Sequence, residues 1–329
     1  MNDDVRVVSA RPPVPGAAPD SCERLLLSIA GIGIELTWAG ARLADEGALR
    51  FYREFLSDGD RRSRRNQTNV RLHVQCGELP TVKPETVIFD ALPNHWRLFR
   101  ANGHAVFEVF HTLPPHPLIQ VSVMAPDFAS GDVYLWPGKS SRRPSWSLPR
   151  TMRPFGELLL IQHLLRQRRG VLVHALAVAD RGEGFLFVGR SGAGKSTLAN
   201  LYKPHGNVTI LGDERVVVTT EQGRFWLSGT PWPGDGFRVS GDRVPLRKVF
   251  FLEHGSCNAV IPDTRLALYG LLFQQLFLPF WHDEALGFAV NFAHGLITAV
   301  PACRLAFVND RTAVEFLRAR GAAGHSLGG

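Results

Sequence analysis

Nine consecutive residues in the middle of the chain have the types and the spacing of a phosphate-binding loop. They are Gly189, Arg190, Ser191, Gly192, Ala193, Gly194, Lys195, Ser196 and Thr197. In the pattern G-x-x-x-x-G-K-[ST], the glycines let backbone N–H groups converge on phosphate oxygens. The lysine reaches the β- and γ-phosphates, and the hydroxyl after it ligates Mg²⁺. The loop therefore predicts nucleotide binding. The alternative is a fortuitous glycine-rich turn with an exposed lysine.

Such a loop works only between a strand that positions the turn and a helix whose N-terminus adds partial positive charge. Residues 185–188 are apolar and predict a buried strand. Residues 198–202 read as the start of a helix. The motif is thus found in the strand–loop–helix context that it requires.

Two adjacent carboxylates follow the loop at a short distance. A P-loop enzyme needs a carboxylate near the metal, at a strand end close to the phosphates. Residues 208–214 predict a short strand that ends in Asp213 and Glu214, and Asp213 lies 18 residues after Lys195 (213 − 195). That spacing leaves room for one helix and one strand, a minimal crossover. It is too short for ABC-type and many motor ATPases, and neither an LSGGQ-like segment nor a guanine-reading N-K-x-D is present.

A histidine precedes the loop. His174 lies 21 residues before Lys195 (195 − 174), on the predicted strand 171–178 next to the strand of the loop. A histidine in an apolar strand is usually a satisfied core residue. Its expected place in the C-terminal half of that strand, beside the loop, favours a functional role. The other histidines of the first half of the chain are expected to be surface or core residues: His73, His95, His104, His111 and His116.

The chain is long enough for two domains. Residues 1–21 predict a disordered lead-in, and residues 22–140 a mostly antiparallel β domain for recognition or accessory roles. Residues 138–149 are expected to form a linker. Residues 150–320 then predict an α/β P-loop domain, and residues 321–329 a disordered tail.

The elements expected within these domains come from hydrophobic periodicity and turn signals. A short amphipathic helix is expected at 48–56, and an apolar helix at 155–165 that stops before a C′ glycine, Gly170. Further helices are expected at 263–277, 285–296 and 313–320. Strands are expected at 24–36, 70–75, 96–100, 104–110, 118–123, 133–136, 215–218, 224–227, 246–252 and 304–308.

Charge and composition limit the partners. The net charge is +7 and the pI about 9.6. The densest basic run, residues 61–65, lies in a polar stretch, and no helix carries a continuous basic stripe. This pattern favours a solvated arginine-rich surface over nucleic-acid or acidic-peptide binding.

The N-terminus has no apolar signal region, and no run of about 18 apolar residues predicts a membrane span. The four cysteines form no C-x-x-C pair, so zinc is not expected. A cytoplasmic protein with reduced, buried thiols is predicted.

Taken together, these residues resemble the C-terminal catalytic domain of bacterial HPr kinase/phosphorylase, whose fold is related to the core of phosphoenolpyruvate carboxykinases. That family carries a His, a P-loop Lys and an Asp-Asp pair in this order and at about this spacing. The wider chain is similar to HPr-kinase-like proteins found with peptide-modification and polysaccharide gene clusters. The specific match covers roughly residues 150–260. The segments that carry it are 155–159, 170–174, 189–196, 211–215, 229–234 and 245–247.

The resemblance implies ATP and Mg²⁺ as cofactors and a role for each residue. Lys195 and the loop amides hold the phosphates, while Ser196, Asp213 and Glu214 serve the metal. Asp213 is the implied general base toward an acceptor hydroxyl, with Glu214 supporting the metal or the acceptor and His174 tuning Asp213. The resemblance also implies that one of three arginines, Arg215, Arg243 or Arg247, stabilises the negative charge on the phosphate that is transferred. HPr kinases are hexamers, so homo-oligomerisation is also implied.

Two departures separate the chain from HPr kinases. The carboxylate pair is Asp-Glu rather than Asp-Asp, and the glycine-rich stretch of the bifunctional enzymes is missing; residues 229–236 form a different Gly/Pro/Trp loop. HPr and phosphorylase activity are therefore not expected. Three functions remain open: a kinase for a Ser/Thr hydroxyl of a peptide (such as a precursor peptide), a protein or a small molecule; a P-loop ATPase or nucleotide-dependent switch; and a nucleotide-binding scaffold without chemistry.

Overall fold

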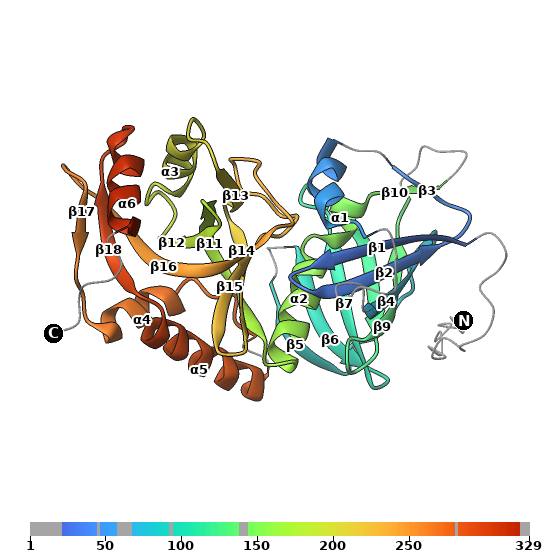
Figure 1. The fold of residues 1–329 in the computed structure, drawn as a ribbon. Coiled ribbons are helices and arrows are strands. Elements are labelled where there is room, and N and C mark those ends of the chain that lie inside the picture. The colour runs from blue at the N-terminus through green and yellow to red at the C-terminus, as the bar shows by residue number, and fades with distance from the viewer. Residues whose placement is uncertain are drawn as a thin grey trace, which may run out of the picture. The chain divides into compact units, whose positions relative to one another are not determined.

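The computed structural model describes residues 22–44, 47–57, 68–91, 95–137, 144–279 and 282–322. The fold is mixed α/β with two large sheets (Figure 1). It divides into two compact units, Met1–His163 and Leu164–Gly329, and the division falls within helix α2 (Phe155–Arg166). The expected lead-in 1–21, the basic run 61–65 and nearly all of the tail lie outside the described residues. The domain boundaries expected from the sequence stay a prediction.

The first unit contains an eight-stranded sheet with the order β1-β2-β4-β9-β8-β7-β6-β5. Two pairings, β2 with β4 and β4 with β9, are parallel, and the others in this sheet are antiparallel, largely as expected. Alternating burial along β4 shows one face packed and one solvated. The strands are β1 Glu23–Ile29, β2 Ile32–Trp38, β4 Thr68–Cys76, β5 Thr86–Asp90, β6 Trp96–Ala101, β7 His104–Phe110, β8 Leu118–Met124 and β9 Ser130–Leu135.

Two expectations for this unit were wrong in part. The helix expected at 48–56 is a 3₁₀-helix, η1 (Gly47–Phe55). The described part of the expected linker forms β10 (Ser145–Trp146), which pairs with β3 (Arg42–Leu43), and the start of α1 (Leu148–Met152). Buried Trp146 packs edge-on against Trp38 with ring centroids 5.1 Å apart, and this burial fixes a segment that its composition marked as a loop.

The second unit is built around a sheet with the order β12-β11-β14-β15-β16-β18-β17. Because β12 also pairs with β16, the path through β11, β14, β15, β16 and β12 closes on itself. The strands are β11 Gly170–Asp180, β12 Glu183–Val188, β13 Val208–Gly212, β14 Arg215–Glu221, β15 Arg224–Ser228, β16 Arg243–His254, β17 Ala259–Ile261 and β18 Ala302–Phe307. The strands expected at 171–178, 185–188, 208–214, 215–218, 224–227, 246–252 and 304–308 are confirmed, with ends shifted by a few residues.

Strand β11 determines which ends of the other strands meet. Both β12 and β13 pair with β11 in the antiparallel sense, so they run in the same direction on either side of it. Their carboxyl ends therefore lie at the same edge of the sheet. The glycine loop leaves β12 at this edge, and the carboxylate pair follows β13 there.

Two helices pack beside each other on a common apolar cluster. These are α3 (Lys195–Tyr202) and α6 (Thr312–Ala322), whose buried residues join side chains of β11, β12, β16 and β18 in one core. Leu198 and Tyr202 enter it from α3, and Val314 and Leu317 from α6. Two other helices, α4 (Arg265–Phe273) and α5 (Asp283–Ala299), pack against each other.

Two helix ends differ from expectation. The helix expected to reach residue 277 ends at Phe273, because the chain after it pairs with β11: His174 N donates to Gln275 O at 2.8 Å, and Phe277 N donates to Leu172 O at 3.0 Å. Gly170 is not a C′ glycine; Arg168 takes the positive φ of 49° after α2. A Cβ at Gly170 would lie 2.3 Å from Val218 O, so close strand packing explains this glycine.

Candidate functional site

Three glycines give the loop a shape that other residues would not allow. Gly192 and Gly194 have φ angles of +82° and +96°, in the left-handed region. A Cβ at Gly194 would lie 2.7 Å from Cζ of Phe307, and a Cβ at Gly189 would lie 2.7 Å from that of Ala193. The glycines of the sequence motif thus occupy the positions where the backbone turns or is crowded.

Helix α3 begins at the last glycine of the loop. Gly194 is its N-cap, with no side-chain cap, and its first turn has no acidic residue. Uncapped N–H groups together with the helix dipole favour an anion at this end. Of the remaining predicted loop residues, Arg190, Ser191 and Ser196 are exposed, and Ala193 and Thr197 are half-buried.

Lys195 lies against the loop itself. Only 8% of its surface is exposed, and its Nζ donates to the carbonyl oxygens of Gly189 at 2.6 Å and Arg190 at 3.2 Å. Burial lowers the pKa of this ammonium, and the charge of Glu214 opposes the shift. The lysine is therefore held at the loop, within electrostatic reach of one member of the carboxylate pair.

His174 joins the same cluster. It is the fifth residue of the eleven in β11, so the expectation that it lies in the C-terminal half of its strand was wrong. It still reaches the loop, since β11 runs antiparallel to β12 and Ala175 pairs with Val188. Desolvation lowers the pKa of the imidazole, as does the charge of Lys195, while Glu214 acts in the opposite direction. A neutral imidazole is thus favoured beside an ammonium and a carboxylate.

Glu214 is the more accessible member of the carboxylate pair. Its side chain is 30% exposed, and its Oε1 lies 2.5 Å from Nη1 of Arg215. The guanidinium of Arg215 also stacks over the ring of Phe277, with its Cζ 5.3 Å from the centroid. Arg215 pairs with His174 across β14 and β11. These contacts place Glu214 and Arg215 together at the loop edge of the sheet.

Asp213 faces a different way. It is 4% exposed; its Oδ1 accepts from Gly234 N at 2.8 Å, and its buried Oδ2 has no hydrogen-bond partner among the described residues. A Cβ at Gly236 would lie 2.0 Å from Oδ2. Desolvation raises the pKa of this carboxyl, against the lowering effects of the Gly234 N–H and the Arg238 charge. Neighbours in sequence thus occupy different surroundings, Glu214 near Lys195 and Asp213 beneath residues 234–238.

Of the three arginines considered for charge stabilisation, the structure brings one to the loop. Arg215 lies there. Arg243 pairs with Glu221 at 2.7 Å and stacks on Trp226, and Arg247 lies 3.7 Å from Glu183 at the start of β12. The proposals for Arg243 and Arg247 were therefore wrong, because the direction of β16 carries both toward the opposite end of β12 from the loop.

Two further residues at the site escaped sequence reasoning. The Nε2 of His254 lies 2.9 Å from Gly192 O, and Nη2 of Arg238 donates to Oδ1 of Asn200 on α3 at 2.5 Å. His254 ends β16, the parallel neighbour of β12. A parallel strand ending at the loop was a usable signal for His254, whereas the contact of Arg238 depends on the path of an irregular segment.

Comparisons with known proteins leave the family open. The sequence matches no family model and no curated protein. Among solved structures, the HPr(Ser) kinase/phosphatase from Coxiella burnetii is similar to this chain, with 12% identity and a TM-score of 0.27, over 46% of this chain and 93% of that one. The part of the chain that the structure describes contains no helix long and apolar enough to cross a membrane.

The thiols match the expectation in one case. Cys303 is buried, Cys22 and Cys76 are half-buried, and Cys257 is exposed. The expectation of buried thiols was therefore wrong for Cys257.

Proposed function

We propose that the chain is an ATP-dependent kinase that transfers the γ-phosphate to a Ser or Thr hydroxyl of a peptide or protein. One observation carries the proposal. Lys195 stands at the uncapped N-terminus of α3, in a loop where two glycines have positive φ, with the charge of Glu214 and the imidazole of His174 in reach. Positioning and charge stabilisation supply most of the catalysis of phosphoryl transfer. This cluster provides both.

The loop residues have the roles of a nucleotide site. In this P-loop, backbone N–H groups of residues 189–197 would hold the phosphates, and the Lys195 ammonium would exchange its bonds to Gly189 and Arg190 carbonyls for phosphate oxygens. Arg215, fixed by Glu214 and Phe277, would counter negative charge at the transferring group. When ATP is bound, it supplies the phosphoryl group and the leaving group.

The donors present also fit Mg²⁺. This ion prefers oxygen ligands and is usually bound through one or two carboxylates together with substrate phosphates and waters. The exposed Ser196 hydroxyl and Glu214 would supply the protein's share.

Asp213 is the proposed general base. A carboxyl whose pKa is raised by burial is a better proton acceptor near neutral pH than an ordinary aspartate. Its Oδ2 has an open valence, which an acceptor O–H would fill once residues 234–238 allow access. The neutral imidazole of His174 and the charge of Glu214 set the field in which the proton moves.

A second function, ATP hydrolysis, is favoured by one specific contrast. Glu214 is 30% exposed beside Lys195, whereas Asp213 is 4% exposed. An accessible carboxylate near the phosphates can orient water as easily as a hydroxyl.

In either case we propose the β-rich residues 22–140 as the part that selects the acceptor or partner.

The test measures transfer and hydrolysis together. Purified protein is incubated with γ-labelled ATP, Mg²⁺ and an array of Ser-, Thr- and Tyr-containing peptides, and released phosphate is recorded. A kinase labels Ser or Thr peptides and loses this on Asp213→Asn. An ATPase releases phosphate without labelling and loses release on Glu214→Gln. Glu221→Gln, an exposed carboxylate in the β14–β15 hairpin, is the matched control. Nucleotide binding without either reaction would contradict both functions.

A further inference from the structure

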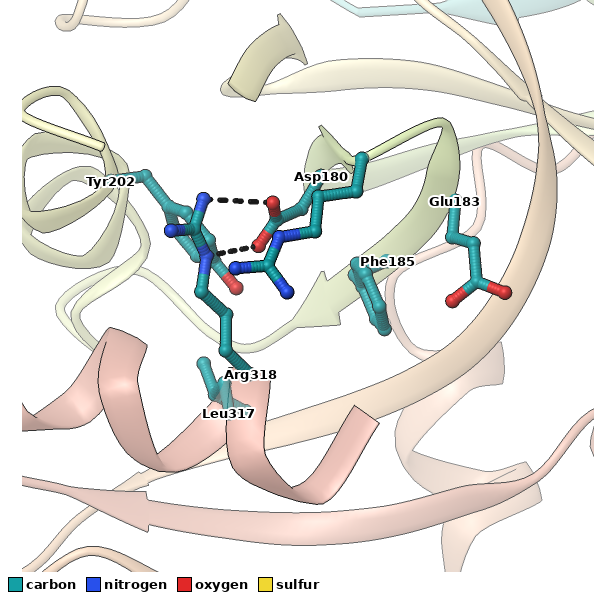
Figure 2. Close-up of a pocket in the computed structure, with 7 residues that line it drawn as sticks. Asp180, Glu183, Phe185, Tyr202, Leu317 and Arg318 are labelled. Carbon is teal, nitrogen blue, oxygen red and sulfur yellow. Dashed lines mark hydrogen bonds and ion pairs between the residues drawn. The ribbon is translucent and has the colours of Figure 1, made fainter. Parts of the chain in front are cut away.

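A cavity lies at the C-terminal end of α3. It has a volume of about 160 Å³ and is bounded by the last turn of α3, the turn between β11 and β12, and α6. Figure 2 shows the labelled side chains around it. The lining residues are Asp180, Arg181, Glu183, Phe185, Tyr202, Leu317 and Arg318.

An oriented guanidinium forms one wall. Arg318 donates from Nε and Nη2 to the two carboxylate oxygens of Asp180, at 2.8 and 2.9 Å (Figure 2). Its Nη2 also donates to Gly206 O at 3.0 Å. The Asp180 side chain is 5% exposed. The bidentate pair fixes the plane of the guanidinium. Its Nη1 makes none of these bonds and keeps its two N–H donors.

A buried hydroxyl without a partner forms another wall. Tyr202 is 1% exposed, and its ring packs 6.0 Å from that of Phe187. None of the described residues accepts or donates a hydrogen bond at its hydroxyl, which lines the cavity. Burial raises the pKa of Tyr202, so the phenol keeps its proton and remains a donor. The hydroxyl is thus a donor that the described residues leave available to the cavity.

Both carboxylates that line the cavity are paired with arginines. Asp180 pairs with Arg318, and Glu183 lies 3.7 Å from Arg247. The guanidinium of exposed Arg181, at the β11–β12 turn, forms no ion pair or side-chain hydrogen bond with described residues. The guanidinium of Arg181 is therefore a further donor at the cavity, in addition to those of Arg318 and Tyr202.

We propose that this cavity binds a small organic carboxylate. The carboxylate would accept from Tyr202 Oη, Arg318 Nη1 and Arg181, and its apolar body would lie against Phe185 and Leu317. A cavity of about 150 Å³ holds benzene in another protein, so a molecule the size of benzoate fits. The site lies one helix length, about 12 Å, from Lys195, and it does not depend on the proposed kinase activity.

Titration calorimetry with benzoate tests the proposal, with the neutral isostere benzamide as the comparison ligand. We expect benzoate to bind the full chain and benzamide to bind at least about tenfold more weakly, since a hydrogen bond to a charged group contributes 1.5–3 kcal/mol. Tyr202→Phe and Arg181→Gln should each weaken benzoate about tenfold. Tyr202→Phe keeps the buried ring, and a thermal melt verifies folding.

Two control variants locate the binding. Arg224→Gln removes an exposed arginine from the equivalent turn of the β14–β15 hairpin, and Lys195→Ala alters the nucleotide loop; neither should change benzoate affinity. The proposal would be overturned if no binding of benzoate were detected at concentrations up to about 10 mM, which would reveal dissociation constants in the millimolar range. Equal affinity for benzamide would also overturn it, as would benzoate binding that is lost with Lys195→Ala and kept with both cavity substitutions.

Discussion

We propose an anion site at each end of helix α3, and the two sites are built by different means. At the first end, backbone N–H groups, a helix dipole and Lys195 surround an exposed glycine loop. At the last end, the donors are side chains, Tyr202 and Arg318, held around a small cavity by Asp180. A backbone site accepts any phosphate-sized anion, whereas a side-chain site selects by shape.

The same contrast explains why the sequence predicted the site at the N-terminal end of α3 but not the cavity at its C-terminal end. The loop residues are contiguous, and their glycines are required by local geometry. The lining of the cavity comes from α3, the β11–β12 turn and α6, which only the fold brings together. The predictions below test whether the two ends are independent, in decreasing order of expected effect.

The largest effect is expected at Asp213, the proposed general base. Asp213→Asn should lower phosphotransfer by about 10²- to 10⁴-fold, the usual contribution of a general base, and leave benzoate affinity at the last end unchanged. Burial favours the neutral form of Asp213, so stability falls as pH rises from 3.8 through the raised folded-state pKa. The variant should therefore unfold at a higher temperature than wild type at neutral pH. A lower melting temperature with full activity would exclude the assignment.

Lysines at the two ends provide a matched pair. Lys195→Ala should weaken ATP binding by about 10- to 100-fold, as expected for a hydrogen bond to a charged group. Lys203→Ala, which removes an exposed lysine just beyond the last turn, should change it by less than about twofold. Calorimetric titration with ATP and Mg²⁺ measures both. Equal losses in the two variants would mean that general charge, rather than the loop, binds the nucleotide.

A glycine substitution tests whether the loop at the N-terminal end of α3 has the backbone conformation described. Gly194→Ala forces a Cβ at φ +96° to within 2.7 Å of Phe307 and should cost about 1–3 kcal/mol of unfolding free energy. Gly270→Ala, within α4, meets nothing within 4 Å and should stabilise by up to about 1 kcal/mol. Urea denaturation compares the two. If Gly194→Ala is as stable as wild type, the loop adopts another conformation.

A smaller effect on folding stability is expected when the pH is varied, through His174 near the N-terminal end of α3. The folded-state pKa of His174 lies below its usual 6.5, so the unfolded chain binds the proton more readily. Stability should thus be greatest above about pH 6.5 and fall as the pH drops from there through the folded pKa. His174→Gln should flatten that part of the profile. Melting temperatures between pH 5 and 8, on the order of the usual histidine range, provide the measurement, and His205→Gln, a histidine beyond α3, is the control.

The smallest effect is expected at the last end. Tyr202→Phe removes a buried hydroxyl that has no partner among the described residues, so the unfolding free energy should stay the same or rise by up to about 1 kcal/mol. ATP affinity should not change if the two ends are independent. A loss of more than about 1 kcal/mol would show that the hydroxyl has a structural role.

Periodicity located most strands and helices, because apolar alternation and turn residues act locally. It failed where distant contacts decide. Residues 275–277 leave the helix to pair with β11, and Trp146 is buried against Trp38. The glycine at 170 was assigned a helix-ending role, but its reason is the close approach of Val218.

The sequence by itself determined the glycine loop, the lysine and serine after it, and the candidates His174, Asp213 and Glu214. Only the tertiary structure decided how they face one another. Asp213 and Glu214 are covalent neighbours in the bend between β13 and β14, yet Asp213 is buried under residues 234–238, whereas Glu214 is 30% exposed and its charge acts on Lys195. The cavity at Tyr202 had no signal in the sequence, because its donors come from separate elements that only the fold brings together.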